Sequence, residues 1–306
     1  MSVRHLFARF KPIHTCQVMK PYRIHFADFW NGFNPELHNM GPIMKQVFPN
    51  AVFINEPVDV DICVFSVFGD RHKDIDARFK ISYQGEPWVT TFDPKTDLAI
   101  GYSAENIKEF RFPLWNFNIF EDCGYDESKL SKFLEPRNPK WNDSIQYNTQ
   151  PIGAVYSNKS GLRKTAMPIL IQNNLCASYG CLYRTHMPRI DDKSYLVQQH
   201  PFHIAFENQR REGYVSEKLR DGLLNDSLPF YWGCSTWAKE DFNPDAFFDL
   251  SKFNEDEALK ACHTMVDVMN QHSFCESMRK APVFKKAPSL IPLYDAIRNV
   301  VQGYDV

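Results

Sequence analysis

A tyrosine, a carboxylate and an ammonium group stand close together in the second half of the chain, at Tyr214, Glu217 and Lys218. The spacing of the apolar residues around them predicts a helix, and residues three and four apart share one helix face. All three side chains would then lie in its first turn, where free backbone N–H groups and the helix dipole favour an anion. This combination suits the diphosphate of a sugar nucleotide.

Residues 202–233 are predicted to form a strand, a polar loop, this helix and a second strand. The first apolar run ends abruptly at Glu207 and Asn208, and the second strand is expected at Leu228–Gly233. Polar side chains at the end of a buried strand are candidates for contacts to a sugar or a ribose. The alternative for Glu207 and Asn208 is a turn cap.

Three blocks in this region, FEN, YVSEK and LPFYWG, follow one another and resemble the signature of the family 10 glycosyltransferases, the α1,3/α1,4-fucosyltransferases. The family pattern is FEN, then YVTEK, then a strand like VPVYWG. Ser216 stands where threonine is common, and both residues carry a hydroxyl. Gln209 replaces the serine or threonine that often follows FEN. The resemblance implies that the second half of the chain binds GDP-fucose.

Glu86 is the predicted catalytic residue. It closes the segment Tyr83–Glu86, which matches the family's Tyr-x-Gly-Glu. The resemblance implies that its carboxylate takes the proton from an acceptor hydroxyl as that oxygen attacks C1 of fucose, a role worth roughly 10²–10⁴-fold in rate. A structural carboxylate that caps a loop is the alternative. Two further stretches resemble the family's D-x-A-I-G and R-x-P-L: Asp97–Gly101 and Arg111–Leu114.

Arg163 and Lys218 are predicted to bind the donor diphosphate. The resemblance places Arg163 at the family's phosphate-binding arginine, after a strand and a polar loop. Both cations would stabilise the charge that builds on the β-phosphate as GDP leaves, so no metal is expected to be required. Ordinary surface cations are the alternative. Glu217 is expected to bind ribose or fucose hydroxyls, and Tyr214 to contact phosphate or base, with core burial as its alternative.

The sequence offers two apparent metal motifs. Asp59 and Asp61 form a D-x-D, but they precede the strand Ile62–Phe68 instead of following one, which favours a solvated strand entrance. His200 and His203 would lie on opposite faces of an extended strand, which argues against zinc.

Three aromatic residues near predicted loops, Trp30, Phe33 and Trp88, are candidates for a platform that stacks on the acceptor sugar. Core packing is the alternative for each of them.

Apolar runs that end in polar loops and alternate with helical stretches predict an α/β fold with parallel sheets. The resemblance implies the GT-B type, in which two Rossmann-like domains face a cleft. A polar, proline-containing stretch near residues 135–151 marks the linker. We therefore expect an acceptor-binding domain at 1–148 and a GDP-fucose-binding domain at 149–306, with a last helix at 290–301 that can pack back on the first domain.

Strands are expected at Tyr22–Trp30, Asp61–Phe68, Phe79–Tyr83, Asp97–Tyr102, Glu109–Trp115 and Ile152–Tyr156. Helices are expected at about Arg163–Leu175 and at Glu255–Gln271. In the second of these helices, one apolar face is predicted to contain Ala258, Leu259, Cys262, Met265, Val266 and Met269.

Composition limits the partners and the compartment. The formal net charge is −2 and no basic run occurs, which excludes nucleic acid as a partner. The chain has 8 cysteines and no CxxC pair; reduced thiols are favoured, and pairing of Cys176 with Cys181 stays open. The first twenty or so residues show no long apolar run, so neither a signal peptide nor a membrane segment is expected. A soluble, cytoplasmic enzyme of the bacterial or viral style is expected, or a Golgi lumenal one trimmed of its anchor.

The expected function is inverting transfer of L-fucose from GDP-β-L-fucose to a glycan hydroxyl, with α1,3 linkage to an N-acetylglucosamine- or glucose-type residue. Two alternatives remain open. One is an enzyme of the same fold that uses another sugar nucleotide, and the other is a catalytically silent glycan-binding module. The sequence leaves the acceptor, the organism and the oligomeric state open.

Overall fold

The structure, a computed structural model, describes residues 20–87, 93–103, 108–141, 150–181, 183 and 193–303. Its strands are β1 (Arg23–Ala27), β2 (Val52–Ile54), β3 (Val60–Phe65), β4 (Ala77–Tyr83), β5 (Leu98–Gly101), β6 (Glu109–Arg111), β7 (Ile152–Ala154), β8 (Cys176–Ser178), β9 (Phe202–Phe206), β10 (Leu228–Trp232) and β11 (Phe248–Asp249). Its α-helices are α1 (Met40–Val47), α2 (Leu114–Asp122), α3 (Arg163–Gln172), α4 (Lys193–Val197), α5 (Glu217–Leu224), α6 (Ser235–Asp241), α7 (Ala258–Met269), α8 (His272–Lys280) and α9 (Ile291–Gln302). Shorter 3₁₀ helices are η1 (Arg71–Lys73), η2 (Glu127–Leu134), η3 (Pro244–Ala246) and η4 (Glu255–Glu257).

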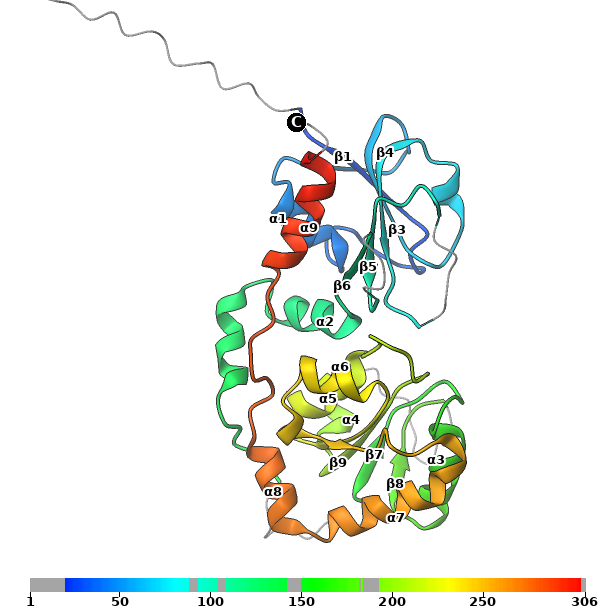
Figure 1. Cartoon of the computed structure of the whole chain (residues 1–306), viewed down its shortest axis with the longest axis vertical. Coiled ribbons are helices and arrows are strands. Elements are labelled where there is room, and N and C mark those ends of the chain that lie inside the picture. The colour runs from blue at the N-terminus through cyan, green and yellow to red at the C-terminus, as the bar shows by residue number, and fades with distance from the viewer. Residues whose placement is uncertain are drawn as a thin grey trace, which may run out of the picture.

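The described strands form two separate sheets, one in each half of the chain (Figure 1). The first has the order β2-β1-β3-β4-β5-β6 and the second the order β11-β10-β9-β7-β8, and every pairing is parallel. The predicted α/β class with two parallel sheets is therefore confirmed. In each sheet the strand order reverses once, between β1 and β3 and between β7 and β9. Ligands of open parallel sheets bind at the carboxyl ends of strands beside such a switch point.

Strand β3 shows why an uninterrupted apolar run predicts a strand that is covered on both faces. Ile62 and Val64 point to one face of the first sheet and belong to the core that contains α1, α2 and α9. Cys63 and Phe65 point to the opposite face, into a smaller cluster with Ile75. Both faces are covered, so apolar residues are needed at every position of the strand.

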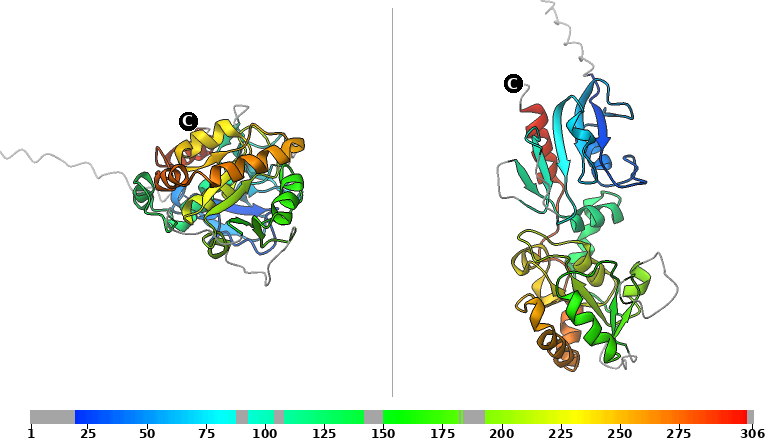
Figure 2. Two further views of the ribbon diagram at one scale, coloured as in Figure 1. Left: turned by 90° about the horizontal axis from the view of Figure 1, so that it is seen from below. Right: turned by 90° about the vertical axis from the view of Figure 1, so that its right-hand side faces the viewer.

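The end of the chain returns to the first domain, where α9 packs against α1 (Figures 1 and 2). The Tyr294 hydroxyl donates a hydrogen bond to Gln46 on α1. Between the domains, Arg137 donates to the backbone carbonyls of Ala281, Leu223 and Met278, and burial lowers the pKa of this guanidinium to about 10. The expected domain boundary, between 148 and 149, lies outside the described residues.

Two predicted elements are wrong in detail. The expected strand at 109–115 stops with β6, and Leu114 begins α2, because Pro113 directly before it has an extended conformation and suits a helix start. On α7, Leu259 is 54% exposed and Val266 only partly buried, whereas Ala261 and Val268 are buried. The buried face of α7 is turned because it packs against α3.

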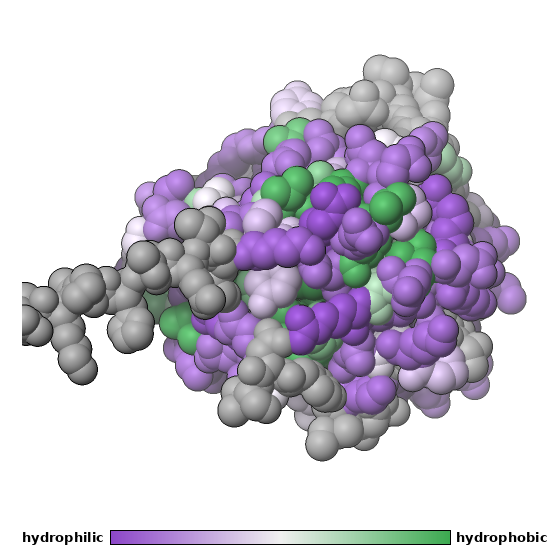
Figure 3. Space-filling model, turned by 90° about the horizontal axis from the view of Figure 1, so that it is seen from above, coloured by the Kyte–Doolittle hydropathy of each residue, from purple (hydrophilic) through white to green (hydrophobic). Residues whose placement is uncertain are grey.

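Among the described residues no helix combines the length and the apolar character needed to cross a bilayer. On the face over the first domain, the described residues intersperse hydrophobic side chains singly or in small groups among hydrophilic ones (Figure 3). This distribution is ordinary for a globular surface.

Candidate active site

Glu207 joins the end of β9 to the beginning of α5. Its side chain is fully buried, and its two carboxylate oxygens accept hydrogen bonds from the backbone N–H and the hydroxyl of Ser216, each at 2.7 Å. Ser216 is the N-cap of α5. Burial raises the pKa of Glu207, although the ammonium group of Lys218, at 3.5 Å, lowers it in part. Glu207 therefore fixes the start of α5 and lies beneath the surface that a ligand would touch.

The predicted pair Glu217 and Lys218 does lie in the first turn of α5. Lys218 Nζ is 3.4 Å from Glu217 Oε1 and donates to Ser216 Oγ at 2.8 Å, and its side chain is 11% exposed. Glu217 is also 3.4 Å from Lys193 Nζ. Burial alone would raise the pKa of Glu217, but Lys218 and Lys193 outweigh it and lower the pKa. The carboxylate thus stays ionised, with both ammonium groups beside it.

Tyr214 does not share this helix face, because α5 begins three residues later. Its ring is buried and packs edge-on against Tyr102 of the first domain, with ring centroids 5.6 Å apart. The prediction of a first-turn tyrosine is therefore wrong. The loop that contains Tyr214 is shaped by the contact between the domains, which helical spacing alone does not reveal.

Arg163 begins α3 and is 1% exposed. Its Nη2 donates to Ser160 Oγ at 2.9 Å and to the side-chain oxygen of Asn208, and the guanidinium lies over the Tyr156 ring, 4.4 Å from the centroid. Among the described residues no carboxylate lies within ion-pair distance of it, and its Nε has no hydrogen-bond partner. A buried cation without a counter-ion is costly, so this arrangement indicates a site for an anion.

The topology explains why Arg163 and Asn208 meet. Arg163 follows β7 and Asn208 follows β9, the two strands at the switch point of the second sheet. A pocket of about 570 Å³ opens beside them. Gly161 in its wall has φ +56°, and a Cβ there would approach the Trp232 ring to 2.6 Å, so only glycine fits. The pocket is lined by Ser160, Gly161, Asn208, Gln209, Arg210, Trp232, Asn254 and Glu255.

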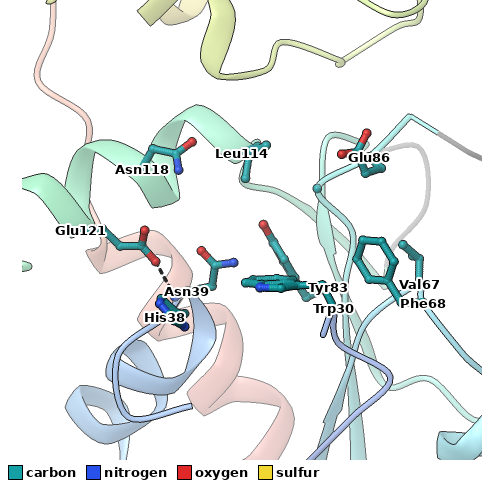
Figure 4. Close-up of a pocket in the computed structure, with 11 residues that line it drawn as sticks. Trp30, His38, Asn39, Val67, Phe68, Tyr83, Glu86, Leu114, Asn118 and Glu121 are labelled. Carbon is teal, nitrogen blue, oxygen red and sulfur yellow. Dashed lines mark hydrogen bonds between the residues drawn. The ribbon is translucent and has the colours of Figure 1, made fainter. Parts of the chain in front are cut away.

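Glu86 follows β4 and lines a second pocket, of about 320 Å³, in the first domain (Figure 4). Burial raises the pKa of Glu86; Lys218 lowers it, and Glu217 and Glu207 raise it further. These charges belong to the second domain, so Glu86 faces the start of α5. Direct contacts confirm that the two carboxyl ends meet: Arg211 Nη1, after β9, donates to the carbonyl oxygen of Pro87 at 2.9 Å.

The predicted aromatic platform is only partly assembled. Trp30 lines the pocket of Glu86. Phe33 stacks on Phe29, with ring centroids 3.9 Å apart, and lines a neighbouring pocket at the carboxyl end of β1. Trp88 lies outside the described residues.

The metal and disulfide candidates lie elsewhere. Asp61 Oδ2 accepts a hydrogen bond from the backbone N–H of Arg23 at 2.8 Å, at the amino end of β3 and therefore at the far end of the strands from Glu86. Asp59 precedes the same strand end. Cys176 is buried and Cys181 is exposed, and no disulfide joins the two.

Sequence reasoning missed the function of two groups of residues. Arg111 donates two hydrogen bonds to Asp241, at 2.8 and 2.6 Å, and so connects β6 to α6 of the second domain. The R-x-P-L resemblance pointed to Arg111 without giving its partner. Asn118 and Glu121 on α2 line the pocket of Glu86. Their helical spacing from Leu114 could have indicated a shared face, but the expected strand at Glu109–Trp115 assigned Leu114 to an extended segment instead.

Comparisons with family models agree with this arrangement. Residues 24–118 match the model described as "Alpha-(1,3)-fucosyltransferase FucT N-terminal domain". Residues 151–276 match "Glycosyltransferase family 10 (fucosyltransferase) C-term". Together the two models cover more than half of the chain.

Individual proteins were also similar. The Alpha-(1,3)-fucosyltransferase FucT of Helicobacter pylori is 39% identical over 79 residues, which make up 24% of this chain and 16% of that relative. A crystal structure of an α1,3-fucosyltransferase superimposes with a TM-score of 0.69 at 18% identity, covering 96% of this chain and 93% of that one. A structure of an α1,3-fucosyltransferase with GDP-fucose gives 0.65 at 19%, covering 95% and 94%. At these identities the solved structures show the fold, which is of the GT-B type.

Proposed function

The chain belongs to glycosyltransferase family 10, the fucosyltransferases, and from this premise we propose that it transfers L-fucose from GDP-β-L-fucose to a hydroxyl of a glycan. One observation carries the proposal. Two cations lie at the carboxyl end of the second sheet: the buried guanidinium of Arg163, which has no carboxylate partner among the described residues, and the ammonium group of Lys218, which pairs with Glu207. The carboxylate of Glu86, whose pKa is raised, faces them from the first sheet.

The second domain binds the donor. The Arg163 fork and the Lys218 ammonium contact the diphosphate, and the N–H groups in the first turn of α5 add to its stabilisation. The Asn208 amide donates hydrogen bonds to ribose or fucose hydroxyls or accepts them, and the Glu217 carboxylate accepts hydrogen bonds from these hydroxyls. Tyr214 lines the donor site from the loop before α5, and the carboxylate of Glu207 acts beneath it by holding Ser216 and Lys218 in place. The division into an acceptor-binding domain before residue 149 and a donor-binding domain after it is part of the same proposal.

The reaction is a single displacement. The acceptor oxygen forms a bond to C1 of fucose as the bond from C1 to the β-phosphate oxygen breaks. Glu86 takes the proton of the acceptor hydroxyl, and GDP departs with the electron pair. Arg163 and Lys218 stabilise the charge that develops on the leaving oxygen, a role that a divalent metal fills in other enzymes. Attack from the face opposite GDP converts the β-linked donor into an α-linked product, and we propose that no metal is required.

The proposal is tested by supplying the protein with GDP-fucose and an N-acetylglucosamine-terminated glycan. We expect glycan-dependent release of GDP, a product with an α-fucosyl linkage by NMR, and little loss of rate in EDTA. Calorimetry should show tighter binding of GDP than of UDP or CMP. A β-fucoside would exclude single displacement, a rate abolished by EDTA and restored by manganese would exclude the metal-free site, and preference for UDP would assign another donor.

The proposed base predicts the acid limb of the pH profile. Glu86 acts only when ionised, and burial raises its pKa above the usual 4.5. We therefore expect kcat/KM to fall with decreasing pH through a midpoint above 4.5. Folding cannot produce this loss through Glu86, because a carboxyl whose pKa is raised in the folded state contributes stability that is greatest at low pH and is lost as pH rises through that pKa.

The measurement is kcat/KM between about pH 4 and 8, with return to neutral pH as the control for irreversible unfolding. A midpoint at or below the ordinary glutamate value would contradict the assignment of Glu86 as the base.

A further inference from the structure

The pocket that contains Glu86 has a second polar wall, formed by α2. Leu114, Asn118 and Glu121 recur at helical spacing, so they share one face of α2. That face lines the pocket on the side across from Glu86 (Figure 4). The opposite face of α2 is in the hydrophobic core. The fold thus presents an amide and a carboxylate to the space in front of the proposed base.

Asn118 brings an unused hydrogen-bonding group to this wall. Its side-chain oxygen is buried and has no hydrogen-bond partner among the described residues. A buried polar atom left unsatisfied in this way is unfavourable, and a ligand that supplies a donor removes the cost. The side chain lines the pocket, so the donor would come from a molecule bound there.

Glu121 is held in position by one oxygen only. Its Oε1 accepts a hydrogen bond from the backbone N–H of Asn39 at 2.5 Å. In the described part of the chain Glu121 has no ion-pair partner, and its Oε2 has no hydrogen bond. The second oxygen can therefore accept a hydrogen bond from a ligand in the same pocket.

The aromatic side of the pocket is formed by Trp30 and Tyr83 (Figure 4). Trp30 packs edge-on against Phe33 and Phe68, with ring centroids 5.0 and 6.4 Å away. An indole held in this way offers an apolar face to the C–H groups of a sugar ring. The volume of about 320 Å³ lies at the lower end of the range for small-molecule sites.

The charge of the pocket is one-sided. Glu86 and Glu121 both line it, and its described lining includes neither lysine nor arginine. His38 is in the lining too, and its Nδ1 accepts the hydrogen bond of the Asn34 N–H at 3.2 Å. An anion bound in this pocket would meet two carboxylates and no lysine or arginine among the described lining residues.

We propose, building on the proposed function, that this pocket binds the sugar residue that receives fucose and selects a neutral hexose or N-acetylhexosamine over an acidic one. The accepting hydroxyl lies at Glu86, and Asn118 and Glu121 hold a neighbouring hydroxyl or acetamido N–H. Trp30 contacts the apolar face of the ring. A sulfate or carboxylate on this residue would meet Glu121 in a partly desolvated site, where like charges repel strongly.

The test compares an N-acetylglucosaminide with its 6-O-sulfated counterpart on wild type, Glu121→Gln and Asn118→Leu. Wild type should prefer the neutral acceptor in kcat/KM by at least about tenfold. Glu121→Gln keeps an acceptor for the Asn39 N–H but loses the charge, so the preference should shrink several-fold. Asn118→Leu should raise KM for the neutral acceptor by about tenfold. GDP affinity should stay unchanged in both variants, and Glu56→Gln, an exposed change on the same domain, is the matched control.

Binding of the two glycosides, measured by saturation-transfer NMR in the presence of GDP, keeps the test independent of turnover. Weaker binding of the neutral glycoside to Asn118→Leu, together with binding of the sulfated one to Glu121→Gln but not to wild type, supports the pocket even if no fucose is transferred. If the glycosides bind as expected but no fucose is transferred, the proposed function is rejected and the assignment of the sugar-binding pocket is kept. Normal transfer with KM and acceptor preference unchanged in both variants would overturn the assignment of this wall.

Discussion

Glu86→Gln should transfer fucose at least roughly 10²-fold more slowly than wild type while binding GDP almost normally. The amide keeps the shape of the side chain and a hydrogen-bonding oxygen, but it cannot take the acceptor proton. The substitution should leave the surrounding structure undisturbed, because in the described residues Glu86 has no hydrogen bond or ion pair that the change would break. Burial, which raises the pKa of Glu86, disfavours the charged form, so the neutral amide should not destabilise the folded protein.

The measurements are single-turnover transfer rates and calorimetry with GDP, with Glu56→Gln as the control for an exposed glutamate of the first domain. The effect should appear in kcat and not in donor affinity, since the base touches only the acceptor. Undiminished transfer by the glutamine variant would return Glu86 to the role of a loop-capping carboxylate. Weakened GDP binding would place it on the donor instead.

Arg163→Met should lower GDP-fucose turnover by roughly 10²–10³-fold and also weaken GDP binding. Among the described residues no carboxylate pairs with this guanidinium, so its charge is available to the diphosphate. Methionine fills similar space over the Tyr156 ring without a charge. Arg163→Lys should recover part of the loss, because it restores the charge but not the bidentate fork.

Substitution of Arg163 tests diphosphate binding more directly than substitution of Lys218 does. Removing the Lys218 ammonium would leave Glu207 and Glu217 without their counter-ion, so lost activity could reflect lost structure. Thermal melting separates the two causes for Arg163, and Arg298→Met on α9 is the matched control. If Arg163→Met remains folded and turns over GDP-fucose near the wild-type rate, the diphosphate is held elsewhere.

The sequence by itself determined the α/β class, the course of most strands and the family. Apolar runs such as Ile62–Phe65 are readable because a parallel strand covered on both faces needs apolar residues throughout. The helix after FEN was predicted from the spacing of its apolar residues, and Glu217 and Lys218 do fall in its first turn. These features depend on neighbours in the chain.

The tertiary structure decided which of these residues meet. Arg163 and Asn208 are 45 positions apart, and they touch because β7 and β9 are adjacent at the switch point of the second sheet. Tyr214 lies outside the expected helix face and packs against Tyr102. The face of α2 that contains Asn118 and Glu121 forms a pocket wall because residues from other parts of the first domain line the same pocket. Such contacts join residues distant in sequence, and their free energy comes from packing and desolvation across elements, which no local pattern of residue types encodes.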